Sequence, residues 1–226
     1  MKRVSRVKFF NLKKELSKNE FRVAIFGSAR IKSNNPYYKE IFKIAQAMGE
    51  IGVDVVSGGG PGLMEAANKG HEVGKKLAKQ KGTHSFGLTI KLPQEQKDNQ
   101  HFDMKKDFQR FSSRLDYFME LSNAVVVAPG GVGTLLEFLY TWQLVQVEHI
   151  YDIPIIMFGE QWKHLIEWVK KGPLKNKLLK KEDLDSIYVV DTAEEAIKIL
   201  KTSYQIFKKA TEFKHKHLRK RIRRFN

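Results

Sequence analysis

One stretch decides the fold class: Ala124-Val125-Val126-Val127-Ala128-Pro129-Gly130-Gly131-Val132-Gly133-Thr134. Its first five residues are apolar, which predicts a strand buried on both faces of a sheet. Its proline and glycines end that strand, and apolar spacing predicts a helix over residues 134–147. A buried strand, a tight turn and a helix in direct succession are typical of an α/β protein with a parallel sheet.

The same alternation extends in both directions from this stretch. Further strands are predicted at 21–26, 53–56, 85–90, 153–158 and 187–190, and further helices at 37–50, 63–79, 106–121, 161–170 and 192–209. Residues 91–104 show no period and are expected to form a loop. Right-handed βαβ connections between such elements place helices on both faces of the sheet. The predicted fold is therefore α/β, a doubly wound parallel sheet in a single domain.

Charge divides the chain of 226 residues into a nearly neutral middle and two basic ends. Residues 1–20 hold seven Lys or Arg and two Glu, and residues 208–226 hold nine Lys or Arg and one Glu, out of a net charge of +16. We therefore expect a basic N-terminal extension at 1–20, the α/β domain at 21–207 and a basic tail at 208–226. Such ends can contact nucleic acid or anionic lipid, but they are more often solvated segments.

Composition removes several classes of function. The chain has no cysteine, which excludes a disulfide framework, a thiolate zinc site and a cysteine nucleophile. No apolar run approaches the roughly 18 residues that a membrane-spanning helix needs. The basic N-terminus has no apolar stretch behind it that is typical of a signal peptide, so the cytoplasm is the expected location.

Three predicted strands end in loops of small residues, at 27–30, 57–62 and 129–134. In open α/β sheets, ligands bind beyond the carboxyl ends of the strands. Glycine lets the backbone approach an anion, and the following helix offers free N–H groups at its N-terminus. The loops therefore predict a phosphorylated small ligand, although each is also explained by turns that need positive φ. The fingerprints of dinucleotide-binding sites and P-loops are both absent from them.

Two motifs resemble the LOG ("Lonely Guy") family. They are Ser57-Gly58-Gly59-Gly60-Pro61-Gly62-Leu63-Met64-Glu65-Ala66-Ala67-Asn68 and Pro129-Gly130-Gly131-Val132-Gly133-Thr134-Leu135-Leu136-Glu137. LOG proteins are phosphoribohydrolases that act on cytokinin riboside 5′-monophosphates and AMP-like nucleotides, and many were once labelled lysine decarboxylases. The resemblance implies a modified Rossmann fold and a homodimer or higher homo-oligomer, with the active site near the subunit interface. It implies no metal and no cofactor, and no loop is accompanied by the lysine that pyridoxal phosphate would require.

The resemblance also implies a catalytic pair, Glu137 and Arg114. Cleavage of an N-glycosidic bond gives the ribose oxocarbenium character, which a carboxylate stabilises while it orients water. The family has Lys after the arginine, whereas this chain has Leu115; Arg110, one turn earlier, is a candidate replacement cation. Thr134 to Glu137 also has the spacing of a helix capping box, which would give Glu137 a structural role.

The predicted contacts to the substrate come from the same loops and motifs. They are Gly27, Ser28, Gly59, Gly60, Met64, Glu65, Gly130, Gly131, Gly133 and Thr134. The expected function is therefore hydrolysis of nucleoside 5′-monophosphates to free base and ribose 5-phosphate. Two alternatives remain open: a non-catalytic protein that binds a phosphorylated ligand, as the related molybdenum-cofactor carriers do, and weak nucleic-acid binding through the basic ends.

Overall fold

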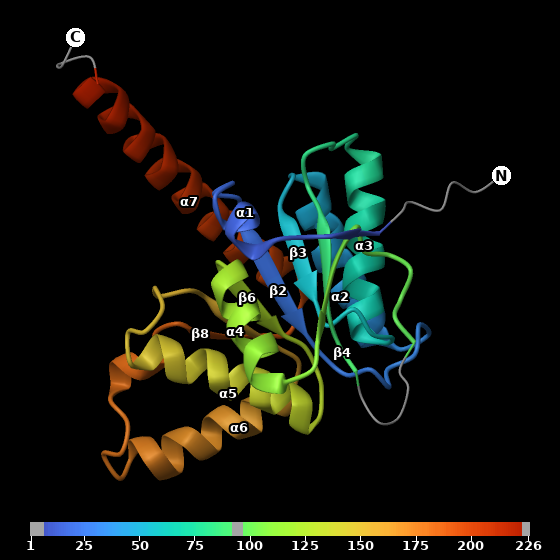
Figure 1. Ribbon diagram of the computed structural model, residues 1–226. Coiled ribbons are helices and arrows are strands. Elements are labelled where there is room, and N and C mark those ends of the chain that lie inside the picture. The colour runs from blue at the N-terminus through green and yellow to red at the C-terminus, as the bar shows by residue number, and fades with distance from the viewer. Residues whose placement is uncertain (1–6, 92–96, 223–226) are drawn as a thin grey trace.

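The computed structural model describes residues 7–91 and 97–222, with the side chains described as far as residue 212. Its described strands form one sheet in the order β1-β5-β4-β3-β2-β6-β7-β8, and all described strand pairs are parallel (Figure 1). The strands are β1 Lys8–Phe9, β2 Arg22–Phe26, β3 Asp54–Ser57, β4 Ser85–Ile90, β5 Met104–Phe108, β6 Ala124–Val127, β7 Ile155–Phe158 and β8 Ile187–Val190. The predicted parallel α/β sheet is confirmed.

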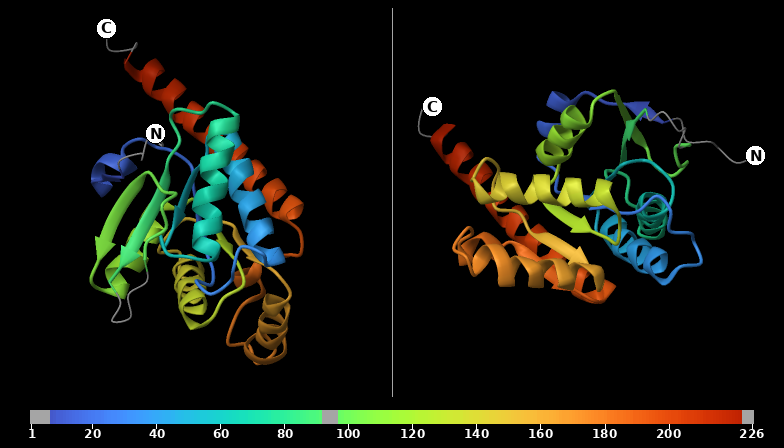
Figure 2. Two further views of the ribbon diagram at one scale, coloured as in Figure 1. Left: turned by 90° about the vertical axis from the view of Figure 1, so that its right-hand side faces the viewer. Right: turned by 90° about the horizontal axis from the view of Figure 1, so that it is seen from below.

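Helices cover both faces of this sheet (Figure 2). They are α1 Leu12–Leu16, α2 Pro36–Glu50, α3 Leu63–Leu77, α4 Phe111–Leu121, α5 Val132–Gln146, α6 Gln161–Val169 and α7 Ala193–Ile222, with a π-helical turn at Lys170–Leu174 and a 3₁₀ turn at Lys181–Leu184. The apolar core on one face joins the sheet to α2, α3 and α7, and the core on the other face joins it to α4, α5 and α6. The sheet is therefore the middle of three layers.

Strand β2 shows why these residues form a central strand. Val23 and Ile25 face the core of α2, α3 and α7, whereas Ala24 and Phe26 face the core of α4, α5 and α6. Successive side chains of a strand point to opposite faces, so a strand between two helix layers must be apolar throughout. Residues 124–127 of β6 and 155–158 of β7 are buried in the same way.

The structure corrects the prediction for residues 91–121. Residues 104–108 form the strand β5, and the helix predicted to begin at Lys106 begins at Phe111. Met104 and Phe108 are buried while the residues between them are partly or fully exposed. A spacing of four places two side chains on one side of either a helix or a strand, so this pair does not distinguish the two.

Both ends contain more regular structure than the sequence suggested. Strand β1 pairs with β5 at the edge of the sheet, and α1 packs near α4. The helix predicted to end at Lys209 continues as α7 to Ile222 and projects beyond the sheet (Figure 1). Residues 193–222 contain no glycine or proline to end it. None of the helices within the described ranges is long and apolar enough to cross a membrane.

The strand order creates a switch point between β2 and β6. The chain leaves β2 through α2 towards β3, whereas it leaves β6 through α5 towards β7, on the other side. The loops that follow β2 and β6 therefore diverge from each other at the carboxyl edge of the sheet. This is where open α/β sheets bind ligands.

Candidate active site

The three glycine-rich loops are joined through the backbone of Ser28. Its N–H donates to the carbonyl of Pro129 at 3.0 Å, and its carbonyl accepts from the N–H of Leu63 at 3.0 Å. Gly62 has a φ of +69°, and a Cβ there would collide with the Ser28 carbonyl oxygen. A Cβ at Gly27 would lie 2.9 Å from the Cβ of Leu63. Glycine at these two positions therefore allows the loops after β2 and β3 to meet.

The loop after β3 rests on a buried network of polar side chains. Asn68 accepts from the hydroxyl of Ser57 at 2.7 Å and donates to the hydroxyl of Ser85 at 2.7 Å. Asn99 donates to Asn68 at 2.9 Å and to the carbonyl of Gly60 at 2.9 Å. Because these buried groups are paired with one another, they fix the path of the loop.

The N-terminus of α5 presents free hydrogen-bond donors. Gly131 is the N-cap, and the first backbone bond runs from the Leu135 N–H to the Gly131 carbonyl at 3.0 Å. Among the described residues, nothing accepts from the backbone N–H groups of Val132, Gly133 and Thr134. A Cβ at Gly131 or Gly133 would meet open space, so these positions leave room for a ligand. Unpaired N–H groups and the helix dipole make this end suitable for an anion.

The capping-box interpretation of Thr134 and Glu137 is wrong. The helix begins at Val132, so Thr134 lies inside its first turn, and α5 has no side-chain cap in the described structure. Thr134 is instead buried and packs against Gly130. A Cβ added at Gly130 would collide with the Thr134 hydroxyl. By contrast, a capping box is present at the start of α7: Glu195 accepts from the Thr192 N–H at 3.3 Å, and the Thr192 hydroxyl accepts from the Glu195 N–H at 3.2 Å.

Glu137 on α5 and Arg114 on α4 form an ion pair in the cleft. Arg114 Nη1 lies 3.5 Å from Glu137 Oε1. Burial raises the pKa of Glu137 to about 7, although the charge of Arg114 acts in the opposite direction. Burial also lowers the pKa of Arg114, with Glu137 opposing that shift. A guanidinium nevertheless stays protonated in proteins, so the pair supplies a fixed cation beside a carboxyl group that titrates near neutrality.

Two contacts hold the guanidinium of Arg114 in place, and Gly58 leaves room for it. Its Nε donates to the carbonyl of Leu88 at 2.7 Å, and its Cζ lies 5.2 Å from the centre of the Phe118 ring. A Cβ at Gly58 would collide with Nη2 of Arg114. Gly58 therefore belongs to the site because it leaves space for this side chain. Leu115 is buried, and Arg110 is an exposed N-cap that does not line the cleft.

These residues enclose a cleft of about 430 Å³ at the switch point. It is lined by most of the sequence-predicted residues: Gly27, Ser28, Gly60, Met64, Arg114, Gly131, Gly133, Thr134 and Glu137. Arg30, a further candidate cation, also lines it. The fold thus brings together residues from four separate parts of the sequence. Their roles in binding and catalysis remain predictions.

Three predicted residues do not line this cleft. Gly59, with a φ of +71°, donates its N–H to the Ser57 hydroxyl at 3.0 Å and accepts from the backbone of the segment after β4. Gly130 packs against Thr134. Glu65 lies near Tyr38, where burial and the Glu65 carboxylate raise the pKa of the tyrosine to about 12. In this structure, these residues shape or support the loops.

The cleft also contains residues that were not among the predicted contacts. They are Ala29, Thr89, Ile90, Asp98, Phe111 and Val132. Asp98 comes from the stretch expected to be an aperiodic loop, and Phe111 lies one helical turn before Arg114. The spacing of Phe111 and Arg114 is a signal that could have placed Phe111 on the same side of the helix. No comparable signal marks Asp98.

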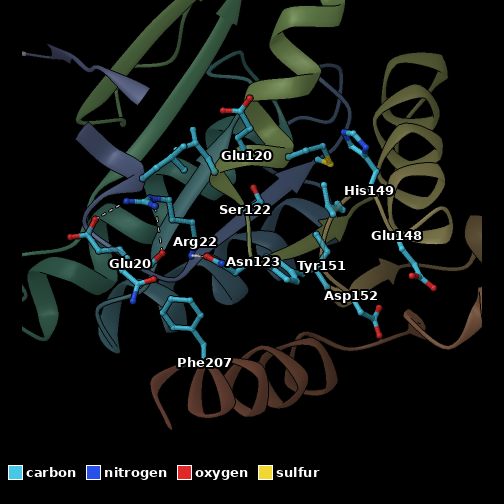
Figure 3. Close-up of a pocket in the computed structure, with 16 residues that line it drawn as sticks. Glu20, Arg22, Glu120, Ser122, Asn123, Glu148, His149, Tyr151, Asp152 and Phe207 are labelled. Atoms are coloured by element: carbon cyan, nitrogen blue, oxygen red, sulfur yellow. Dashed lines mark hydrogen bonds and ion pairs between the residues drawn. The ribbon is translucent and has the colours of Figure 1, made fainter. Parts of the chain in front are cut away.

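A larger cavity, of about 850 Å³, lies at the opposite edge of the sheet (Figure 3). There the Arg22 guanidinium forms ion pairs, with Nη2 2.9 Å from Glu20 Oε2 and Nε 3.2 Å from Oδ2 of the buried Asp54. The backbone N–H of Arg22 donates to Oδ1 of Asn123. None of the glycine-rich loops reaches this cavity, and its lining includes no free helix N-terminus. Its arrangement gives no reason to place the chemistry there.

Pyridoxal phosphate would need a lysine for its Schiff base. The described residues that line the cleft include two arginines, Arg30 and Arg114, but no lysine. The residues present therefore do not fit the cofactor of an amino-acid decarboxylase.

Comparison with known proteins places the chain in a family. The family model described as "Possible lysine decarboxylase" matches residues 64–200. Pyrimidine/purine nucleotide 5′-monophosphate nucleosidase of Escherichia coli K12 is 26% identical over 140 residues, which are 61% of this chain and 30% of that protein. The chain thus spans less than a third of the length of this relative.

Solved structures share the fold at low sequence identity. The molybdenum cofactor binding protein of Rippkaea orientalis has a TM-score of 0.59 at 16% identity, over 81% of this chain and 96% of that one. The molybdenum cofactor carrier protein of Chlamydomonas reinhardtii has a TM-score of 0.56 at 16% identity, over 81% and 98%. These likenesses show the fold alone. The family match covers more than half of the sequence, so the chain belongs to the family described as possible lysine decarboxylases, and the resemblance to the LOG proteins is confirmed.

Proposed function

We propose that the chain hydrolyses the N-glycosidic bond of nucleoside 5′-monophosphates to give free base and ribose 5-phosphate. The observation that carries this proposal is the pairing of Glu137 with Arg114 beside the free N-terminus of α5, in one cleft. The name of the Escherichia coli relative supports the same reaction class. AMP and similar nucleotides, including cytokinin nucleotides, are the proposed substrates, and the cytoplasm is the proposed location.

The phosphate is the anchor in this proposal. Three backbone N–H groups at residues 132–134 point out of the start of α5 and lack acceptors in the described structure. A phosphate there would hold the ribose at a fixed distance from Glu137, which lies on the next turn of the same helix. Binding energy from a part of the substrate that does not react is then used for positioning.

Glu137 acts on the reacting carbon of the ribose. As the bond from C1′ to the base nitrogen breaks, positive charge develops on the sugar, and the Glu137 carboxylate stabilises it. Water adds its oxygen to C1′ and releases one proton to the carboxylate. The electron pair of the broken bond leaves with the base, which takes up a proton from solvent, and Glu137 returns its proton to solvent. Arg114 holds Glu137 in place and offers a cation to the departing base.

The test is base release from a panel of nucleoside 5′-monophosphates, with adenosine as the matched control. AMP should be cleaved, and adenosine should be cleaved at least about 100-fold more slowly, because it lacks the anchoring phosphate. Equal kcat/KM values for AMP and adenosine would contradict the phosphate anchor. Binding of the nucleotides without release of any base would contradict the proposed hydrolysis and support the non-catalytic ligand-binding alternative.

We further propose that the chain assembles as a homodimer or a higher homo-oligomer through α5. This helix is apolar around much of its circumference, and Val132, Leu136 and Leu139 are 83%, 44% and 47% exposed. Apolar residues three and four apart form one stripe on a helix, and an exposed stripe of this kind is typical of an interface. Leu136→Glu should halve the mass or reduce it further in sedimentation, and an unchanged mass would contradict the proposal.

A further inference from the structure

The cleft continues beyond Glu137 and Arg114 to the end of strand β4. Its lining there consists of Thr89, Ile90, Asp98 and Phe111. Strand β4 is separated from β6 by β3 and β2. Three strand spacings correspond to about 14 Å, which is comparable with the length of an extended nucleoside monophosphate. A phosphate held at the start of α5 would therefore place the base at this second end.

A carboxylate side chain lines the second end of the cleft. The Asp98 side chain is 36% exposed, and its Oδ2 lies 2.7 Å from Nζ of Lys105. Lys105 also contacts Asp107 Oδ1 at 2.9 Å. The ammonium group holds the Asp98 carboxylate in position. An ionised carboxylate only accepts hydrogen bonds, so it attracts N–H groups and repels carbonyl oxygens.

An exposed aromatic ring stands at the same end. Phe111 begins α4, lines the cleft and is 52% exposed. Every nucleobase can stack on an aromatic side chain, whatever hydrogen-bond donors and acceptors the base carries. The ring therefore offers binding to any base, whereas the carboxylate distinguishes one base from another.

We propose that Asp98 and Phe111 form the base-binding end of the cleft and that Asp98 selects bases with an exocyclic amino group. Adenine and cytosine present such a group where hypoxanthine and uracil present an oxygen. The inference rests on the proposed function, because it assigns the base of the same nucleotide substrate. It adds the substrate class: nucleotides of amino-substituted bases are preferred over their oxo counterparts.

The test compares two pairs of nucleotides, AMP with IMP and CMP with UMP. For each, kcat/KM for base release and Kd are measured on the wild type and on Asp98→Asn. We expect the wild type to favour the amino member of each pair by about tenfold or more. An Asn amide both donates and accepts, so Asp98→Asn should bring both ratios close to one.

Two further variants separate recognition from general effects. Asp107→Asn removes the other carboxylate of Lys105, and Asp107 does not line the cleft, so this control should keep the amino preference. Phe111→Ala should raise KM for all four nucleotides about equally, because stacking does not distinguish the bases. Thermal melts on each preparation show that the variants are folded.

The outcomes keep the two proposals apart. A wild type that cleaves both members of each pair equally, or a preference that survives in Asp98→Asn, would overturn the role of Asp98 and leave the proposed function intact. A wild type that cleaves none of the four would overturn the proposed function, and the ratios of Kd would then decide the role of Asp98. Absence of both cleavage and binding would overturn both.

Discussion

Replacing Glu137 with Gln separates the proposed catalytic role of this side chain from any role in folding. Gln keeps the size of Glu but carries no charge, so it neither stabilises an oxocarbenium ion nor accepts a proton from water. Loss of a group with this role commonly costs about 10²–10⁴ in rate. We therefore expect Glu137→Gln to bind AMP and to release adenine at least about 100-fold more slowly than the wild type.

The structure also predicts the effect on stability, and its sign is opposite to that of a lost cap. Burial raises the pKa of Glu137 from 4.5 to about 7 in the folded state. Because the folded-state pKa is higher than the unfolded-state value, ionisation lowers the free energy of unfolding as the pH rises from about 4.5 to about 7. The full shift corresponds to up to about 3 kcal/mol, and Gln does not carry this penalty.

The assays are base release from AMP, AMP binding and thermal melts at pH 5 and pH 8, on the same preparations. Glu137→Gln should melt above the wild type at pH 8, and the difference should shrink at pH 5. Glu120→Gln is the matched control, because Glu120 is exposed and lies outside the cleft. A Glu137→Gln variant that cleaves AMP at nearly the wild-type rate would refute the catalytic assignment. A variant that melts well below the wild type at pH 8 would refute the stability argument.

The other predictions concern the cation, the loops, the pH dependence and the N-terminal extension. Arg114→Lys keeps a charge but loses the planar set of donors, so kcat/KM for AMP should fall by at least about tenfold, and an unchanged value would mean that charge alone suffices. Gly62→Ala should lower the free energy of unfolding by more than about 1–2 kcal/mol, because Gly62 has a positive φ and a Cβ there would collide with a carbonyl. Gly82 has neither feature, so Gly82→Ala is the control and should have little effect in denaturant melts. The kcat/KM for AMP should rise as the pH increases through about 7, as Glu137 ionises, and a profile that is flat from pH 5 to 9 would contradict this. Removal of residues 1–20 should lower the melting temperature, because it removes β1 from the edge of the sheet, but base release should persist. Loss of base release from a folded, correctly assembled truncated protein would place part of the site in the extension.

The sequence was sufficient to predict the sheet where one strand is buried on both faces. Residues 124–127 are apolar in succession, and only a strand between two helix layers accounts for that pattern together with the following glycines. Prediction failed where a pattern fits two structures. The pair Met104 and Phe108 fits both a helix and a strand, and pairing with β4 and β1 decides the outcome.

The start of α5 shows a different kind of error. The sequence predicts that Pro129 to Gly133 ends the strand and that the helix begins at Thr134. In the structure, Gly133 lies in the first helical turn, where it leaves space over the free N–H groups. The helix begins two residues earlier than predicted, which places Thr134 inside its first turn, and the capping-box interpretation failed for this reason.

The candidate site could be predicted only as far as its motifs extend. Gly131 to Glu137 form one motif, but the approach of Arg114 to Glu137 at 3.5 Å depends on how α4 and α5 lie on the sheet. The resemblance to a family supplied that pair, whereas spacing alone would not. Asp98 belongs to no motif, because its place in the cleft depends on the path of the chain between β4 and β5.

Arg114, and not the neighbouring Leu115, supplies the charge that faces Glu137. Arg114 and Leu115 are both buried, but Arg114 lines the cleft and Leu115 does not. Adjacent residues on a helix point about 100° apart, so Arg114 is the cation that faces Glu137 and the side chain at position 115 points elsewhere. The described lining then holds two cations, Arg30 and Arg114, against the carboxyl groups of Asp98 and Glu137. Because these side-chain charges partly offset one another, we expect the attraction for the phosphate of the proposed substrate to come largely from the backbone N–H groups of α5. This explains why the glycines that expose those groups, rather than a cluster of basic side chains, distinguish the sequence of the site.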